Sequence, residues 1–268
     1  MTDTVRFIQI SDTHIGPDQD FELYEVNTYR AATALVDAVN RAPAEASFII
    51  HTGDIVAHPD DRAYHLAGEV FSRLRLPVYY VTGNHDDSAM VRKALVFGEC
   101  SFQPAGTRRL SYRFEVGHHT FLALDARGPD AIDPHGILAD EQLEVLAGEL
   151  AEGEGPLTVF VHFPPLPMDS RWLDEEMLLL NGARMHELLR TASGRLRGVF
   201  FGHVHRGTVT FRDGILYSSV GSSFRDFSSW PGSGSVAFDA TPRACFNLVS
   251  LYATTVSVQH HSIPVSWG

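Results

Sequence analysis

The chain has 268 residues, of which 44% are hydrophobic and 20% charged, a composition that is typical of a folded globular protein and excludes disorder. The formal net charge of −12 argues against a partner bound through a polyanionic backbone, so nucleic acid is not an expected ligand. Two isolated cysteines, and no apolar run near the roughly 18 residues of a membrane span, lead us to expect a cytoplasmic protein without disulfides or a membrane partner.

Six short segments predict buried β-strands. Each is a run of β-branched, aromatic or leucine residues with little strict alternation, which is typical of strands covered on both faces. In chain order they are residues 5–10, 48–51, 78–81, 120–124, 157–161 and 198–201.

Helical patterns lie between these strands. Apolar residues share one face over residues 28–41 and again over residues 63–74. Asp140 is predicted to cap a third helix, and residues 177–189 form a weaker fourth pattern that Asn181-Gly182 interrupts. Strands that alternate with helices predict an α/β fold with mainly parallel pairing.

The character of the sequence changes after Arg206. Residues 208–211 and 215–220, joined by Asp213-Gly214, predict a β-hairpin. A Ser/Gly-rich stretch over residues 218–235 follows, and then a strand-like tail over residues 245–258. No repeat or long linker is present, so we expect one domain over residues 1–268, of which residues 206–268 form a β-rich C-terminal part. This part is where an interface between copies of the chain is expected, should a homo-oligomer form.

Polar residues follow five of the predicted strands. Taken singly, a strand-end Asp is often a helix cap, a strand-end His is often only hydrogen-bonded, and a glycine permits a tight turn. Together they converge on one crevice, because ligands gather beyond the carboxyl ends of parallel strands. Buried carboxylates and imidazoles are costly there unless cations compensate them. The five stretches are Ser11-Asp12-Thr13-His14, Thr52-Gly53-Asp54, Thr82-Gly83-Asn84-His85-Asp86, His162-Phe163-Pro164-Pro165 and Gly202-His203-Val204-His205.

These stretches supply a set of candidate metal ligands that is too large for one tetrahedral ion and suits two ions sharing a carboxylate. Imidazole with carboxylate and amide oxygen, without thiolate, is typical of Zn, Fe, Mn or Co sites. His203 and His205 point the same way in an extended chain, whereas a one-residue kink sends them to different ions. The seven candidates are Asp12, His14, Asp54, Asn84, His162, His203 and His205.

The order of the motifs Asp-x-His, Gly-Asp, Gly-Asn-His-Asp, His-x-Pro-Pro and Gly-His-x-His over residues 12–205 resembles the signature of the calcineurin-like metallophosphoesterases. The spacing most resembles the bacterial subgroup of cyclic-nucleotide and glycerophosphodiester phosphodiesterases. The resemblance implies an α/β sandwich of four layers, αββα, with mixed sheets. Two relatives are disfavoured, since Ala57 stands where purple acid phosphatases have a tyrosine ligand, and Ala57-His58-Pro59 where Ser/Thr phosphatases have Asp-Arg-Gly.

The resemblance also implies roles at the matching positions. Asp12, His14 and His205 would hold one metal ion. Asn84, His162 and His203 would hold the second, and Asp54 would bridge the two. His85 would face the substrate phosphate, with orientation of Asn84 as its alternative role. His85, Asn84 and Asp54 are thus the expected catalytic residues, and Phe163 stands where some relatives have a second histidine.

The function expected from this arrangement is hydrolysis of small phosphodiesters, in which a hydroxide shared by two metal ions attacks phosphorus. His85 would bind a phosphate oxygen or protonate the leaving alkoxide. A phosphomonoesterase, a nuclease and a non-catalytic metal-binding scaffold are the alternatives, in falling order.

Several other polar residues are not expected to be metal ligands. Asp86 and Asp87 are expected to cap a helix that runs through Leu95, and Asp125 is expected to be structural. The pairs His118-His119 and His260-His261 are expected at the surface. Within residues 218–227, three side chains are expected to border the substrate pocket, and these are Ser222, Ser223 and Arg225.

Overall fold

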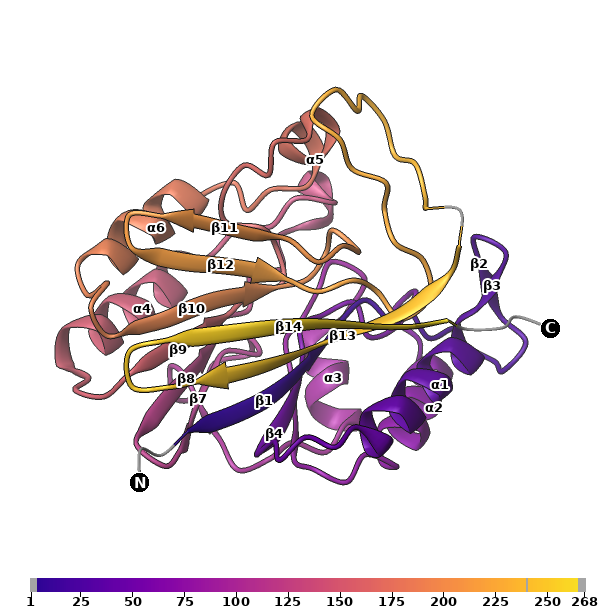
Figure 1. Ribbon diagram of the computed structural model, residues 1–268, viewed down its shortest axis with the longest axis horizontal. Coiled ribbons are helices and arrows are strands. Elements are labelled where there is room, and N and C mark those ends of the chain that lie inside the picture. The colour runs from indigo at the N-terminus through magenta and orange to yellow at the C-terminus, as the bar shows by residue number, and fades with distance from the viewer. Residues whose placement is uncertain (1–3, 240, 265–268) are drawn as a thin grey trace.

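The computed structural model describes residues 4–239 and 241–264 and contains two large β-sheets (Figure 1). The first has five strands, in the order β14 (Val256–Pro264), β13 (Arg243–Leu251), β1 (Val5–Ile10), β4 (Phe48–His51) and β5 (Val78–Tyr80). The second has seven, in the order β11 (Val209–Arg212), β12 (Ile215–Ser219), β10 (Leu196–Phe201), β9 (Leu157–Phe160), β8 (His119–Ala123), β7 (Tyr112–Val116) and β6 (Ser101–Phe102). A small ribbon pairs β2 (Glu22–Leu23) with β3 (Val26–Asn27).

Both sheets are mixed. In the five-stranded sheet β1, β4 and β5 are parallel, and the late strands β13 and β14 add to its edge in antiparallel fashion. In the seven-stranded sheet β8, β9, β10 and β12 are parallel, while β6, β7 and β11 are antiparallel. The expected α/β sandwich with mixed sheets is therefore confirmed: the parallel strands form the centre of the seven-stranded sheet and the part of the five-stranded sheet from β1 to the β5 edge.

Aromatic side chains join the two sheets. The ring of Phe7 on β1 lies 5.2 Å from that of Phe200 on β10 and 5.5 Å from that of Phe160 on β9. Phe48 on β4 meets Phe121 on β8 at 4.9 Å. These rings are at most 1% exposed, and burial of such large apolar surfaces holds the sheets face to face.

Helices cover the outer faces of the sandwich. On the five-stranded sheet lie α1 (Thr28–Arg41), α2 (Asp61–Phe71) and α3 (Ser88–Ala94). On the seven-stranded sheet lie α4 (Asp140–Glu152), α5 (Arg171–Glu176) and α6 (Gly182–Arg190), with the short turn η1 (Asp130–Ile132) before them. None of the helices within the described residues has the length and apolar character needed to cross a membrane.

Three helix boundaries differ from the sequence prediction. Helix α2 begins earlier than expected, because the Asp60 carboxylate accepts hydrogen bonds from the backbone N–H groups of Arg62 and Ala63. Asp140 does not cap α4: it is the first helical residue, and the N-cap is Ala139. The predicted helix over residues 177–189 begins only at Gly182, where Asn181-Gly182 marks its start rather than an interruption.

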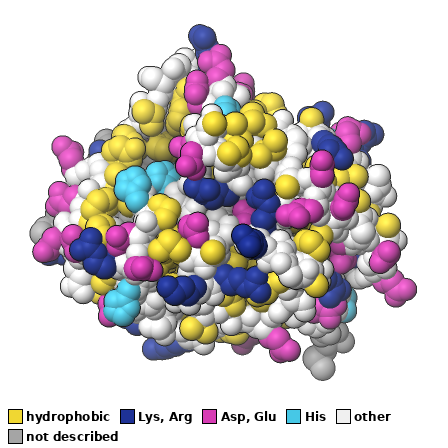
Figure 2. Space-filling model, turned by 180° about the vertical axis from the view of Figure 1, so that it is seen from behind, with side chains coloured by type: hydrophobic (Ala, Val, Ile, Leu, Met, Phe, Trp, Pro, Cys, Tyr) yellow, Lys and Arg dark blue, Asp and Glu magenta, His cyan; other side chains and the backbone are white. Residues whose placement is uncertain are grey.

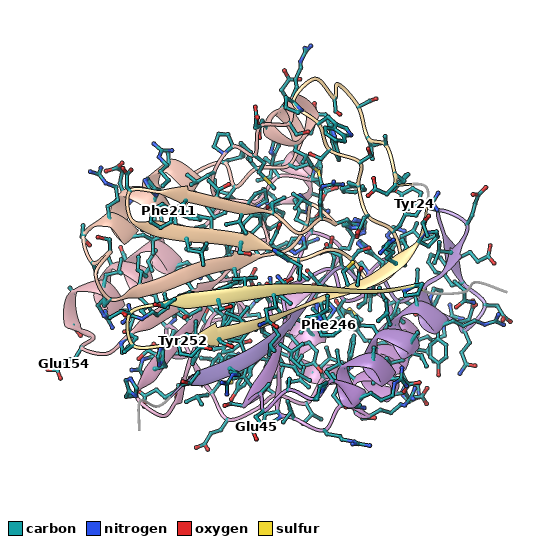
Figure 3. All side chains as sticks on the ribbon, viewed as in Figure 1. Tyr24, Glu45, Glu154, Phe211, Phe246 and Tyr252 are labelled. Atoms are coloured by element: carbon teal, nitrogen blue, oxygen red, sulfur yellow. The ribbon has the colours of Figure 1, made fainter. Side chains whose placement is uncertain are left out.

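The C-terminal part has the hairpin and tail that the sequence predicts. Strands β11 and β12 form the hairpin, and β13 and β14 form the tail. Figure 3 labels Phe211 on β11 and Tyr252 in the β13–β14 turn, whose side chains are 72% and 38% exposed. An interface between copies of the chain at this part stays a prediction.

His119 is buried, so the expectation that it lies at the surface was wrong. Its residue is 1% exposed on β8, whereas its neighbour His118 and the pair His260-His261 are exposed, as expected. Neither ring nitrogen of His119 has a hydrogen-bond partner. Burial, with smaller contributions from His118 and Arg197, lowers the pKa of His119 to about 4.

This histidine should make the free energy of unfolding depend on acid. Because the folded pKa lies below the ordinary 6.5, the unfolded chain takes up the proton first as pH falls, and stability present above pH 6.5 is lost toward pH 4 at up to about 1.4 kcal/mol per pH unit. His119→Leu should remove this component. Urea unfolding of both proteins at pH 7.5 and pH 5 measures it, and an equal acid loss in the two would contradict the assignment.

Candidate metal centre

The loops that follow β1, β4, β5, β9 and β10 meet at one end of the sandwich. The backbone N–H of Asp12 donates to the Gly53 carbonyl at 2.9 Å, so the loops after β1 and β4 lie side by side. The N–H of His203 donates to both carboxylate oxygens of Asp12 at 3.1 Å, which joins the seven-stranded sheet to the five-stranded one. The convergence predicted from the strand ends therefore takes place across both sheets.

Five of the predicted ligands have a left-handed backbone. Their φ angles lie between 43° and 71°, a region that non-glycine residues rarely adopt and that concentrates at functional sites. In an extended strand, side chains two residues apart point to the same side. The left-handed conformation breaks this pattern, so such side chains can point in different directions. The five are Asp12, His14, Asp54, His203 and His205.

Potential ligand atoms gather around Asp54 in three groups, of which two match the expected ligand sets. One group is Asp12, His14 and His205, and the other is Asp54, His162 and His203; within each group the atoms lie within 4.8 Å of one another. The Oδ2 atom of Asp54 lies 3.6 Å from Nε2 of His14 and 3.3 Å from Nε2 of His162, and thus between the groups. His203 and His205 fall into different groups, as the kinked alternative predicts.

Nitrogen atoms of neighbouring imidazoles face one another within each group. Nε2 of His14 lies 3.1 Å from Nε2 of His205, and Nε2 of His162 lies 3.0 Å from Nδ1 of His203. Nδ1 of His162 donates to the Thr52 carbonyl at 2.7 Å, and Nδ1 of His205 donates to the Arg225 carbonyl at 3.0 Å. These bonds hold a proton on Nδ1 of each ring and direct Nε2 at the cluster, the orientation of metal-binding histidines.

The protonation states of three of these histidines also suit metal ions. Burial lowers the pKa of His14 and of His203 well below the ordinary value, and lowers that of His205 to about 4. Neutral imidazole, the form that binds metals, therefore predominates at neutral pH for these three. Burial opposes charge on His162 too, but the Asp54 carboxylate outweighs it and raises the His162 pKa to about 9.

The two buried aspartates of the cluster differ in the direction of their pKa shifts. Burial raises the pKa of Asp12 to about 7, an effect that His162 opposes and Asp54 reinforces. For Asp54, burial acts in the same upward direction, yet the surrounding histidines hold its pKa well below the ordinary range. The charges of this buried set of carboxylates and imidazoles are only partly compensated, and bound cations stabilise such a set.

Asn84 and His85 complete the cluster from the loop after β5. The buried Oδ1 atom of Asn84 has no hydrogen-bond partner, which fits a metal-directed amide oxygen. The His85 N–H donates to Oδ1 of Asp54 at 2.9 Å, and its ring Nδ1 donates to the Ala57 carbonyl at 2.8 Å. The His85 ring lies 4.7 Å from that of His14, so it also forms a possible ligand group with His14 and Asp54.

Two glycines allow the loops to approach this closely. A Cβ atom at Gly83 would lie 2.5 Å from the backbone nitrogen and 2.1 Å from Oδ1 of Asp54. A Cβ atom at Gly53, whose φ is 107°, would lie 2.3 Å from Nδ1 of His162. These glycines are therefore required for packing of the ligand loops, beyond the tight turn that the sequence indicates.

Asp86 does not cap a helix, contrary to the sequence prediction. Only Asp87 does so, by accepting from the N–H of Met90 at the start of α3. The buried Asp86 carboxylate instead accepts hydrogen bonds from the N–H groups of Ile55, at 3.1 Å, and Gly83, at 3.0 Å. It thereby ties the loop of Asn84 to the loop of Asp54, and the Gly-Asn-His-Asp spacing is the signal that could have indicated this role.

Other residues around the cluster were not assigned from sequence. The Phe224 ring lies 5.6 Å from that of His14 and 5.7 Å from that of His205. Residues 218–227 thus reach the site through Phe224 and the Arg225 carbonyl, while contact of the Ser222, Ser223 and Arg225 side chains with substrate stays a prediction. Phe163 packs against His203, with ring centroids 4.8 Å apart.

Asp125, two residues after the end of β8, has the structural role expected of it. Its carboxylate accepts hydrogen bonds from the Ser88 hydroxyl at 2.6 Å and from the Leu110 N–H at 2.8 Å.

The geometry of the site agrees with comparison to known proteins. Residues 5–207 match the family described as calcineurin-like phosphoesterase, well over half of the chain. The chain belongs to this family. The calcineurin-like phosphoesterases are two-metal enzymes, in accord with the two ligand groups that meet at Asp54. The expected metallophosphoesterase identity is confirmed.

Relatives within this family are phosphodiesterases. The 3',5'-cyclic adenosine monophosphate phosphodiesterase CpdA of Escherichia coli K12 is 30% identical over 203 residues, which cover 75% of this chain and 70% of CpdA. The glycerophosphodiester phosphodiesterase GpdQ of Enterobacter lignolyticus is 26% identical over 255 residues, 94% of this chain and 89% of GpdQ. The solved structure of GAP50, the anchor in the inner membrane complex of Plasmodium, shares the fold with a TM-score of 0.57 at 14% identity, covering 98% of this chain and 89% of GAP50.

Proposed function

We propose that the chain is a metal-dependent phosphodiesterase that hydrolyses small phosphodiesters of the cyclic-nucleotide or glycerophosphodiester type. The observation that carries this proposal is the position of Asp54 Oδ2 between two buried groups of ligand atoms. The substrate class is supported by the relatives, which include a cyclic AMP phosphodiesterase and a glycerophosphodiester phosphodiesterase.

The proposed ligands divide into two sets that share Asp54. One set is Asp12, His14 and His205, and the other is Asn84, His162 and His203. The nitrogen, carboxylate and amide donors suit Fe, Mn, Zn or Co. When bound, such a pair of ions activates water and polarises the phosphate.

His85 is the proposed contact to the substrate phosphate. Burial lowers its pKa, but the nearby Asp54, the Ala57 carbonyl, Asp86 and Asp133 more than offset burial, so the pKa of His85 is raised. Its Nδ1–H is held by the Ala57 carbonyl at 2.8 Å. In its protonated form the ring has an Nε2–H to donate to a phosphate oxygen or to the leaving alkoxide.

His85→Ala should lower kcat for a phosphodiester by about 100-fold or more, the usual contribution of a positioned proton donor, while two metal ions remain bound. Metal analysis of the same sample supplies the control, because the alternative role of His85 is to orient Asn84 or to act as a ligand. Unchanged kcat would contradict the proposed role, and so would a loss of bound metal that accounts for the loss of turnover.

A side-by-side assay tests the substrate class. Metal-loaded protein is given bis(p-nitrophenyl) phosphate, p-nitrophenyl phosphate, cyclic AMP and glycerophosphoethanolamine. The proposal predicts a higher kcat/KM for the diesters than for the monoester. A preference for the monoester would favour a phosphomonoesterase, and no turnover by protein that has taken up two metal ions would favour a scaffold.

A further inference from the structure

A hollow of about 740 Å³ lies beside the proposed phosphate site. Its wall comes from four segments that are distant in sequence: the start of α3 near Ser88, the loop over residues 106–109, the segment over residues 125–129, and Glu141 on α4. Arg127, Gly128 and Pro129 line this hollow and also a small opening that Asn84 borders. The hollow therefore adjoins the metal centre on its Asn84 side.

Three arginines, Arg108, Arg109 and Arg127, line the hollow of an otherwise acidic chain. Figure 2 shows that Lys and Arg side chains do gather on one face of the molecule, with Asp and Glu among them. A concentration of guanidinium groups beside a phosphate-binding centre is a common way to bind a further anion.

The carboxylates of the hollow are already engaged within the protein. Asp87 accepts from the Met90 N–H at 2.9 Å as the cap of α3. Asp125 accepts from the Leu110 N–H at 2.8 Å and from the Arg127 N–H at 3.1 Å. Glu141, the third, lies 3.3 Å from the guanidinium of Arg109. Arg109 thus has an acidic partner on the wall of the hollow, whereas the guanidinium groups of Arg108 and Arg127 pair with no carboxylate that lines it.

Both of these arginines have capacity for a ligand. Arg108 is exposed and makes no ion pair or side-chain hydrogen bond within the described ranges 4–239 and 241–264. Arg127 pairs through Nη2 with Asp130 at 3.0 Å, but the Asp130 side chain is 90% exposed, so this pair is weak. The Nε atom of Arg127 is buried and has no partner.

One further acid, Asp133, borders the small opening. Asp133 does not line the hollow itself, and neither Arg108 nor Arg127 forms an ion pair with it.

We propose that the hollow lined by Arg108 and Arg127 binds a second anionic group of the substrate, a carboxylate or phosphate carried on one alcohol of the phosphodiester. The scissile phosphate lies at the metal centre and the second anion lies against the two guanidinium groups. This inference rests on the proposed phosphodiesterase function and narrows its substrates to diesters with an additional negative charge.

The test compares substrates that differ only by this charge. For the carboxylate, kcat/KM is measured for glycerophosphoserine and glycerophosphoethanolamine. For the phosphate, it is measured for bis-glycerophosphate with and without a terminal phosphate. We expect about tenfold or more in favour of at least one anionic substrate, the effect of one charge-assisted hydrogen bond.

Two variants locate this preference. Arg108→Glu and Arg127→Gln should each bring the ratio of kcat/KM values close to one, and neither removes a buried contact on which folding depends. Arg171→Gln is the matched control, since Arg171 lies on α5, is 69% exposed and pairs with Glu175. The Arg171→Gln protein should have the same ratio of kcat/KM values as the unaltered protein.

The outcomes separate the two proposals. Turnover of every diester without preference for the anionic member overturns the anion site and leaves the phosphodiesterase proposal in place. A preference that survives in both arginine variants also overturns it. Absence of turnover for all diesters overturns the phosphodiesterase proposal, and the anion site with it.

Discussion

Asp54→Ala should lower kcat for bis(p-nitrophenyl) phosphate by about 1000-fold or more. Its Oδ2 lies 3.6 Å from Nε2 of His14 and 3.3 Å from Nε2 of His162, so its loss would remove the ligand proposed to be common to both ions. The Lewis-acid contribution of such ions amounts to several kcal/mol, and each 1.4 kcal/mol or so is a factor of about ten in rate. Stopped turnover assays with excess metal measure the effect.

The matched control is Asp61→Ala. Asp61 lies on α2 with its side chain 83% exposed, and its contact with Lys93 is long, at 3.8 Å. Removal of this carboxylate should leave both kcat and metal content unchanged. Full turnover in the Asp54→Ala protein would contradict the bridging role. The metal content of the Asp54→Ala protein should also fall below that of the Asp61→Ala protein.

Gly83→Ala should cost activity by about 100-fold, comparable with loss of a residue that positions metal ligands. The added methyl group would lie 2.5 Å from the backbone nitrogen of Asp54, a contact that only movement of the loop can relieve. Such movement shifts Asp54 and Asn84 relative to each other, since Gly83 precedes Asn84 directly. kcat/KM and metal affinity, measured on the same preparation, should decline together.

Gly148→Ala provides the comparison within the same chain. Gly148 lies within α4, and a Cβ atom there meets nothing within 4 Å. Alanine is the better helix former by about 1 kcal/mol, so this variant should be as active as the unaltered protein and slightly more stable. Normal activity in Gly83→Ala would show that the contact at Asp54 is not restrictive.

The strand ends were predictable because two independent features of the sequence coincide there. Apolar runs such as residues 48–51 indicate buried strands, and the polar residue that follows each run stands at the edge where parallel strands meet. Asp54 and His162 could therefore be placed in one cluster without knowledge of the sheet order. The cores of both sheets follow from the same runs, with ends that differ by only a residue or two from the predicted ones.

The left-handed backbone of His203 and His205 was not predictable in the same way. Spacing of two residues allows either a shared direction or a separation, and the choice depends on hydrogen bonds from elsewhere. The His203 N–H is held by Asp12, and the His205 ring by the Arg225 carbonyl. These partners lie far from the two histidines in sequence, or in a loop without a pattern of its own.

Long-range packing also explains two wrong predictions, the helix cap at Asp86 and the surface position of His119. An aspartate before a helix resembles a cap, and for Asp87 this is what it is, but Asp86 turns toward Ile55 and Gly83. The sequence beside His118 suggests a surface position for His119, whereas it is the first residue of β8, pairs with Val116 of β7 and is buried. Neither the burial of His119 nor the partners of Asp86 can be read from local sequence.

The most direct test of the two-metal account is titration of metal into metal-free protein, with turnover of bis(p-nitrophenyl) phosphate measured at each addition. The account predicts almost no activity without metal and a rise in activity that is complete only when two ions are bound per chain. The same stoichiometry of two ions is expected for Mn, Zn, Fe and Co. Full activity in the metal-free protein, or saturation at a single bound ion, would contradict it.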